Sequence, residues 1–242
     1  QQSFLDDAGS IRFGKIDAND TFSSIDAAGS FQYNLMHNPP SLNLYLPTYP
    51  AEATALQASL RLNDHVTGHF GWYDGTNAAF DPATGRTGPS TGTRGPATFF
   101  DNGGHWFLIT EWEFDWQLAP HLPGTGSIGG WLQTGRTTTA GSSTTGVEDV
   151  PGLYLSWQQT IWSGDAASSE AGGGVRFFGQ FALSDPDKNP SHWSLMTGLS
   201  ATGVIPGRPA DAVGIAGGWT AFSDDPEIYR STMPDGSAGP AG

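Results

Sequence analysis

The chain has 242 residues, and its 34 glycines and 17 prolines follow no fixed period, a usage typical of many short strands joined by turns. It contains no cysteine, so disulfides and thiolate metal sites are excluded. The formal net charge is -14 with only ten lysines and arginines, which argues against nucleic acid as a partner because phosphate binding requires clustered cations.

Alternation of apolar and polar residues predicts the first strands. Residues 10–17 alternate imperfectly and are followed by a loop-like segment that reaches Pro50. Residues 53–63 and 66–74 alternate clearly on either side of a tight turn, so they predict a hairpin. Residues 75–102 are rich in glycine, proline and threonine, and a connection of this length is usually a functional or a mobile loop.

The most regular strand pattern lies at residues 103–118, GGHWFLITEWEFDWQL. With a period of two, aromatic residues fall on one face and acidic residues on the other. The two faces are Trp106, Leu108, Thr110, Trp112, Phe114 and Trp116, and opposite them Phe107, Ile109, Glu111, Glu113 and Asp115. In a water-soluble sandwich the aromatic face would point into a core, whereas in a transmembrane barrel it would face lipid and the acids would line a wet lumen. The pattern of this strand alone is compatible with both architectures.

Further strands are predicted towards the C-terminus, and residues 120–125 and 137–151 are predicted as a turn and a polar loop. The strands are residues 127–136, 152–162, 175–184, 192–203 and 210–222. The chain is therefore all-β, with about nine or ten strands joined alternately by short turns and long loops. A membrane barrel has this asymmetry between its rims, but sandwiches also have uneven loops, so both architectures stay open.

Several fragments carry a family resemblance, in order along the chain. They are GKIDAND at 14–20 with Phe22, Tyr49-Pro50, Tyr73-Asp74-Gly75, residues 107–111, Gly130-Trp131 with Thr134-Gly135, Gly152-Leu153-Tyr154 with Gln158-Gln159, and Gly207-Arg208-Pro209 with Asp211 and Gly214. In this order and spacing they resemble the carbohydrate-selective porins of the OprB family, from about Ile11 to Phe222.

The resemblance implies an antiparallel transmembrane β-barrel of sixteen strands in the outer membrane of a Gram-negative bacterium, through which sugars diffuse. Because about ten strands cannot close such a barrel, we expect residues 1–242 to be a single porin domain that is incomplete at both ends, as an open sheet edge in lipid leaves backbone groups unpaired. The implied partners are sugars and outer-membrane lipid, with a monomer and a homotrimer both open. No enzymatic activity, cofactor or metal is expected.

The predicted lumen-lining residues combine acids, amides and a few cations that hydrogen-bond sugar hydroxyls weakly enough for transit. They are Lys15, Glu111, Glu113, Asp115, Gln158, Arg176 and Gln180. Lys15 is included on the family resemblance, although Arg12 lies close to it on the opposite face of the same strand. Arg208 and Asp211 are expected to pair and fix a turn.

Two other interpretations remain. Glu111 and Glu113 lie two residues apart on one strand face, with their Cα atoms roughly 6.5 Å apart, and paired carboxylates at such a distance can serve a glycosidase as acid and base. The alternative is therefore a soluble β-sandwich or jelly roll that binds or hydrolyses carbohydrate. A third interpretation is a structural barrel segment without solute preference.

Overall fold

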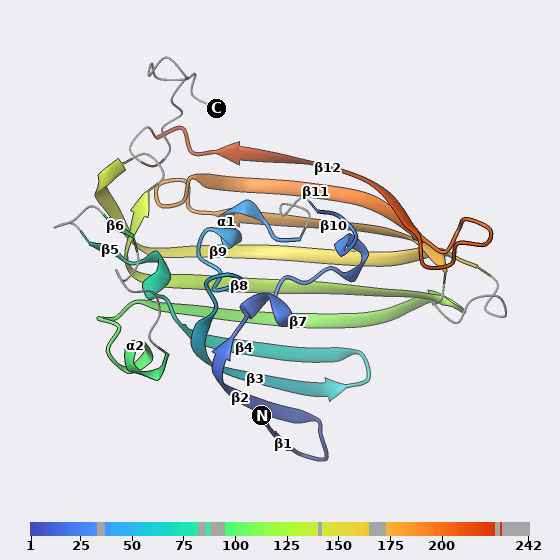
Figure 1. Cartoon of the computed structure of the whole chain (residues 1–242), viewed down its shortest axis with the longest axis horizontal. Helices are drawn as coiled ribbons and strands as arrows, with labels where there is room; N and C mark the ends of the chain where they lie inside the picture. The colour runs from blue at the N-terminus through green and yellow to red at the C-terminus, as the bar shows by residue number, and fades with distance from the viewer. Residues whose placement is uncertain are drawn as a thin grey trace.

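The computed structural model describes residues 1–32, 37–81, 86–87, 95–139, 142–164, 173–225 and 228. Among these residues, ten strands form one antiparallel sheet in the order β1-β2-β3-β4-β7-β8-β9-β10-β11-β12 (Figure 1). The bounds are β1 (Gln2–Phe4), β2 (Gly9–Ile16), β3 (Ala53–Asn63), β4 (Val66–Asp74), β7 (Trp106–Ala119), β8 (Leu122–Thr139), β9 (Ser142–Ser163), β10 (Gly174–Ser184), β11 (Ser191–Thr202) and β12 (Ala212–Phe222). The predicted all-β antiparallel class with about ten strands is confirmed.

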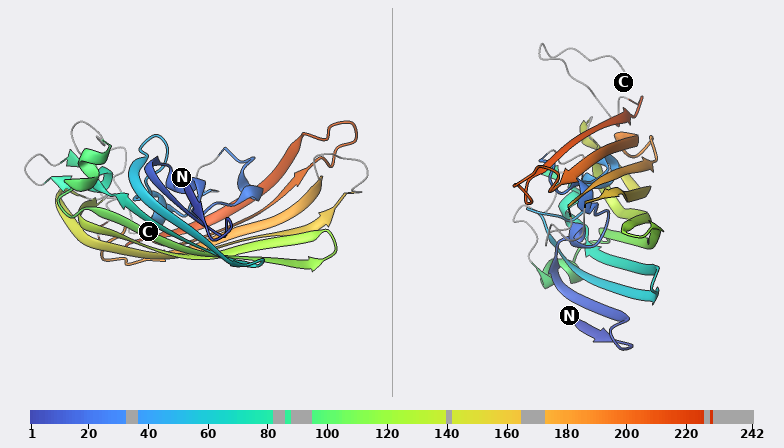
Figure 2. Two further views of the ribbon diagram at one scale, coloured as in Figure 1. Left: turned by 90° about the horizontal axis from the view of Figure 1, so that it is seen from below. Right: turned by 90° about the vertical axis from the view of Figure 1, so that its right-hand side faces the viewer.

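Two long connections leave the sheet at the same end. The first joins β2 to β3 and contains η1 (Ala18–Asp20), η2 (Asp26–Ala28) and α1 (Pro40–Asn43). The second joins β4 to β7 and contains η4 (Thr76–Ala78), the small sheet of β5 (Phe80–Asp81) and β6 (Arg86–Thr87), and α2 (Pro96–Phe100). The sheet is curved into a trough, and the first connection lies on its concave side (Figure 2).

The loop predicted at residues 137–151 is wrong. β8 runs on to Thr139 and β9 begins at Ser142, and the two strands pair through Arg136 with Glu148 and Thr137 with Val147. Threonine and valine fit a pleated surface whether or not they are buried, so a polar segment without apolar alternation still forms a hairpin. The turn predicted at residues 120–125 is also shorter, because β8 already begins at Leu122. The expected pair of Arg208 and Asp211 is present as an ion pair.

The register aligns residues of one kind across the sheet. One row contains, from β3 to β12, Ser59, His69, Glu111, Gly129, Tyr154, Ala182, Ser194 and Thr220. The neighbouring row contains Leu60, Gly68, Trp112, Ile128, Leu155, Phe181, Leu195 and Trp219. Because side chains alternate along a strand, the polar row lies on one face, the inner face, and the apolar row on the other, the outer face.

The outer face exposes its large side chains, which reverses the pattern of a water-soluble sheet. Trp112 is 43% exposed and Leu155 42%, whereas Glu111 on the inner face is 3% exposed. A soluble sandwich would bury the tryptophan and expose the acid. The observed arrangement is the one expected when the outer face meets lipid. Among the described residues, no helix is both long and apolar enough to cross a membrane.

The orientation of the two faces can be tested with one introduced charge. We expect Leu155→Lys to reduce the free energy of unfolding in lipid vesicles by about 2–4 kcal/mol, because the ammonium would lie among acyl chains. Thr125→Lys is the matched control, since Thr125 lies on the inner face beside Asp115. The measurement is denaturant unfolding of the full-length gene product in vesicles. Equal effects of the two variants would contradict the assignment.

Candidate functional site

The segment between β2 and β3, residues 17–52, is called here the inner segment. Its ends are tied by side chains: Asp17 accepts hydrogen bonds from Asn19 N at 2.8 Å and from Tyr49 N at 3.1 Å. Asn19 and Asn38 exchange amide hydrogen bonds of 3.0 and 3.2 Å. Pro40 occupies the first turn of α1, where the missing N–H has no cost. The described parts of the segment therefore form a compact unit, not an extended loop.

Aromatic packing presses the inner segment onto the sheet. The Phe22 side chain is fully buried, and its ring centroid lies 6.4 Å from that of Tyr73 on β4. Tyr45 lies 5.2 Å from Trp131 on β8. Burial raises the pKa of the Tyr45 phenol to about 12, so the ring remains neutral. Burying an aromatic side chain of this size contributes about 1.5–3 kcal/mol.

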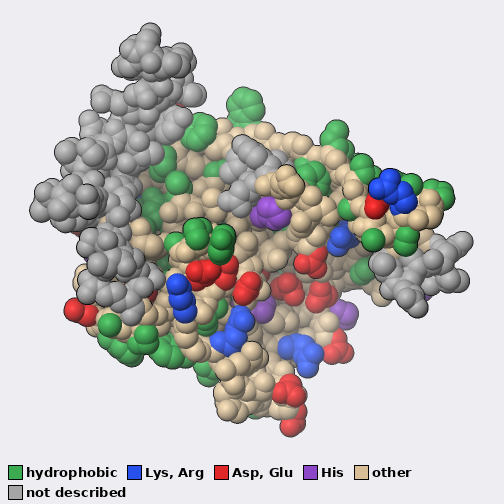
Figure 3. All heavy atoms as spheres, viewed as in Figure 1, with side chains coloured by type: hydrophobic (Ala, Val, Ile, Leu, Met, Phe, Trp, Pro, Cys, Tyr) green, Lys and Arg blue, Asp and Glu red, His purple; other side chains and the backbone are tan. Residues whose placement is uncertain are grey.

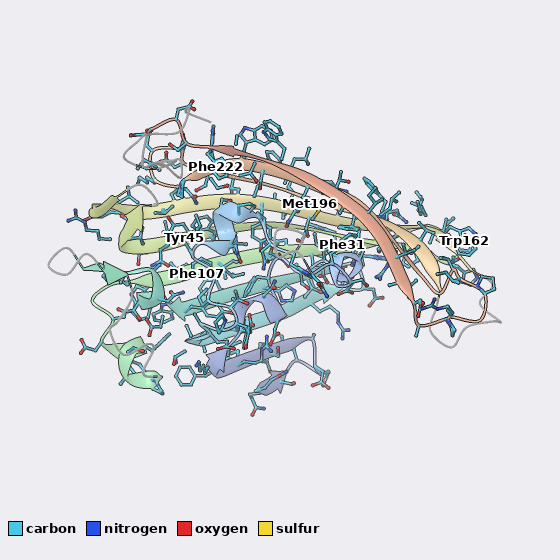
Figure 4. The ribbon with its side chains drawn as sticks, turned by 45° about the horizontal axis from the view of Figure 1, so that its top comes forward. Phe31, Tyr45, Phe107, Trp162, Met196 and Phe222 are labelled. Carbon is cyan, nitrogen blue, oxygen red and sulfur yellow. The ribbon has the colours of Figure 1, made fainter. Side chains whose placement is uncertain are left out.

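A second apolar cluster fastens the middle of the inner segment. Phe31 lies 5.5 Å from Phe178 on β10, and Ala27 and Ala28 pack in the same cluster with Met196 on β11. Tyr45 and Phe31 thus mark two separate docking points along the concave face, the first near β8 and the second near β10 and β11 (Figure 4). The segment lies across several strands and covers part of the inner face.

Hydrogen bonds from the strands hold the backbone of the inner segment. Glu111 Oε2 accepts from Ser23 N at 2.8 Å and from Tyr154 Oη at 2.6 Å. Gln158 Oε1 accepts from Ala27 N at 2.9 Å. Each of these acceptors was predicted to line a lumen, but both are used here as anchors for a loop.

A glycine makes the contact between Tyr154 and Glu111 possible. Gly129 lies between these two residues in the register, on the strand that separates β7 from β9. A Cβ atom at this position would come within 2.1 Å of the Tyr154 ring. The ring therefore lies across β8 to reach the Glu111 carboxylate, which only glycine permits.

Four more of the predicted residues share the inner face. Glu113 is half-buried, and Asp115 is exposed and accepts from Thr125 Oγ1 at 2.9 Å. Arg176 is half-buried opposite Ser200, and Gln180 is buried opposite Met196. Glu113 is close enough to Asp115 and to Asp26 of the inner segment for their charges to interact. Acidic side chains gather in the middle of the concave face, with lysine and arginine around them (Figure 3).

The expectation for Lys15 requires a correction. Lys15 pairs with Thr54 in the register of the outer face and lies 3.8 Å from Glu52. Arg12 occupies the inner face instead, where its Nη2 donates to Thr21 Oγ1 at 2.6 Å and to Gln57 Oε1. Two-residue alternation, applied to this strand in preference to the family match, would have identified Arg12.

Gln57 and Tyr73 complete a polar chain that sequence reasoning missed. Gln57 is buried, accepts from Arg12 and donates through Nε2 to Tyr73 Oη. Both residues lie at inner-face positions of predicted strands, so the alternation of side chains is enough to place them on the inner face. Nothing in the sequence indicated that they would form a hydrogen-bonded chain with Arg12, which itself donates to Thr21 of the inner segment.

Comparison with known proteins identifies the family of this curved sheet. The family model described as "Carbohydrate-selective porin, OprB family" matches residues 1–234. The chain belongs to this family. Among solved structures, the high pH structure of Pseudomonas putida OprB is similar to this chain, with a TM-score of 0.68 at 16% sequence identity. The match covers 92% of this chain and 53% of the OprB chain, so the chain spans about half the length of that porin. None of the curated proteins compared with the chain matches it.

The family match confirms the resemblance drawn from the GKIDAND and GRPADAVG fragments. At 16% identity, the likeness to OprB concerns the fold, which is an antiparallel sheet of porin type. The roles predicted for individual lumen residues remain predictions, and their positions around the inner segment are the basis for testing them.

The anchoring role of Glu111 predicts a local effect. Glu111→Ala leaves Ser23 N–H and Tyr154 O–H without their acceptor, at a cost of about 1–3 kcal/mol for each buried group. We expect faster amide hydrogen exchange in residues 21–28 while β7 and β9 stay protected. Thr125→Ala removes a hydrogen bond to Asp115 on the same face and serves as the control. Unchanged exchange in residues 21–28 would show that Glu111 does not hold the inner segment.

Proposed function

We propose that the full-length protein is an outer-membrane diffusion channel for mono- or oligosaccharides, in which residues 1–242 form part of one porin domain. The observation that supports this most is the polar inner face crossed by a folded segment, set against an apolar and exposed outer face. In a barrel wall of this kind the inner segment, which is packed on the strands, narrows the lumen, so a solute passes beside the segment.

The groups beside the inner segment suit sugars. Carboxylates such as Glu113 and Asp115 accept hydrogen bonds from hydroxyl groups, and Arg176 donates them. Each such bond replaces one to water and contributes only about 0.5–1.5 kcal/mol, so a sugar is recognised yet leaves readily. Glu111 and Gln158 act on the solute indirectly, since both hold the segment that shapes the passage.

The glycosidase alternative has less support. Glu111 is 3% exposed, and its Oε2 already accepts two hydrogen bonds. A general acid must reach the glycosidic oxygen, and the inner segment covers this carboxylate. The family is also one of porins. A catalytic role for Glu111 with Glu113 is therefore not part of the proposal.

The proposal includes the surroundings of the chain. Lipid of the outer membrane would contact the outer face, where leucine and tryptophan side chains are exposed. The pathway would lie inside the barrel of one full-length chain, so a monomer would suffice and a homotrimer would carry three separate pathways.

Conductance measurements test the channel directly. The full-length gene product, purified from the outer-membrane fraction, is added to planar bilayers. We expect stepwise conductance that decreases when a transported sugar is added, because the sugar occupies the path of the ions. A soluble protein without conductance would overturn the proposal.

The acidic side chains near the inner segment predict ion selectivity. We expect Glu113→Gln combined with Asp115→Asn to lower the ratio of cation to anion permeability by roughly two- to threefold, because two negative charges beside the pathway are removed. Asp64→Asn combined with Asp187→Asn removes the same charge from exposed turns and is the control. Reversal potentials in a salt gradient give the ratio, and equal ratios for both double variants would place the acids away from the pathway.

A further inference from the structure

The short helix α2 lies against the outer face, at the end of the sheet where the long connections leave it. Phe99 of α2 is 4% exposed. Its ring centroid lies 5.9 Å from that of Phe13, 5.3 Å from that of Trp72 and 5.1 Å from that of Trp106. The register assigns these three partners to the outer face of β2, β4 and β7. Phe99 therefore fastens the α2 part of the connection between β4 and β7 to the outer face.

Burial beneath α2 supports this placement. Thr54 is the register partner of Lys15 and lies on the outer face, yet it is 1% exposed. Outer-face residues farther along the strands, such as Leu60 and Phe70, are exposed. α2 contacts both β3 and β4, so it covers the outer face at this end only.

Phe100 follows Phe99 and has a different environment. It is 78% exposed, the highest exposure of the phenylalanines named among the exposed large side chains of the described residues, and its ring stands edge-on to Phe99 at 5.3 Å. Through Phe99 it is continuous with Phe13, which is itself exposed on the wall. Exposure of such a ring to water is unfavourable. The ring extends an apolar surface that continues along the strands.

A charged pair marks where this apolar surface ends. Lys15 lies two residues beyond Phe13 on the same face of β2 and forms an ion pair with Glu52 at 3.8 Å. Aromatic rings next to a lysine at the end of an apolar band are typical of the boundary between acyl chains and headgroups. The position of α2 beside Phe13 thus corresponds to this boundary.

We propose that α2 is a lipid anchor, in which Phe99 clamps the connection to the wall and Phe100 inserts among the acyl chains of bilayer lipids. We assign lipid as the partner of the exposed Phe100 ring because the apolar surface around this ring is continuous with the exposed outer face and ends at the ion pair of Lys15 with Glu52. The anchor holds the α2 part of the second long connection on the outer face, whereas Ala78 of the same connection packs with the inner segment in the cluster on the inner face. This inference requires a membrane around the wall but no particular solute.

Residues 1–242 contain no cysteine, so a cysteine introduced among them gives a site-specific label once any cysteine elsewhere in the full-length product is replaced. The full-length gene product carrying Phe100→Cys is labelled with an environment-sensitive fluorophore and placed in phosphatidylcholine vesicles that contain lipids with spin labels on their acyl chains. We expect a blue-shifted emission and loss of most of the fluorescence. Leu155→Cys on the outer wall is the lipid-facing reference, and Asp187→Cys, an exposed polar position on the turn between β10 and β11 at the same end, is the aqueous control.

The outcomes separate the possible occupants. Quenching at position 100 that matches position 155 supports the anchor. Quenching by aqueous iodide alone, as expected at position 187, would overturn it, and protection from both quenchers would show a protein contact and also overturn it. Conductance of each labelled protein confirms folding, since Phe100 makes few contacts that a cysteine would remove. The anchor does not depend on sugar transport, so a channel without sugar preference would leave this test intact.

Discussion

Neighbouring strands of the ten-stranded sheet pair in a nearly continuous register, and this constraint organises the rest of the molecule. A residue on the inner face of β3 has inner-face partners on every strand as far as β12. A slip of one residue would turn a whole strand over, exposing its polar side chains to the outer side. The alternation of Glu111 with Trp112 recurs as Ser59 with Leu60, Ser194 with Leu195 and Thr220 with Trp219. It produces one face with most of the polar side chains and one apolar face from a chain that has no long apolar segment.

The inner face holds the inner segment through both apolar and polar contacts. One part of the segment contributes to a buried apolar cluster with the sheet, and hydrogen bonds from its backbone to side chains of the strands add polar anchors. Glu111 shows how such an anchor is stabilised. A buried carboxylate is costly when it lacks partners, but here two donors from different parts of the chain converge on one oxygen. The same hydrogen bonds order the loop and offset the free-energy cost of burying the Glu111 carboxylate.

Sequence reasoning succeeded where the physical signal was local. Alternation at residues 103–118 gave the strand and both of its faces, and the separation of Trp112 from Glu111 is present in the structure. It failed where the signal was distant. Ser23 and Ala27 lie far along the chain from Glu111 and Gln158, and no local pattern shows that a glutamate on a strand will accept a hydrogen bond from a loop. Residues 18–50 therefore resemble an ordinary loop in sequence. Lys15 shows another kind of error, in which similarity to a family was weighed above the alternation of the strand itself.

The inner segment begins and ends on strands that are hydrogen-bonded to each other. β2 and β3 are neighbours in the sheet, so both attachment points of the segment lie at one rim, side by side. Docking is then an intramolecular reaction with a high effective concentration, and weak contacts are enough to keep the segment in place. No pairing between the described strands of the sheet runs through the segment. Substitutions in the docking contacts therefore act on the fit of the segment to the inner face, while the ladders of the sheet keep all their hydrogen bonds.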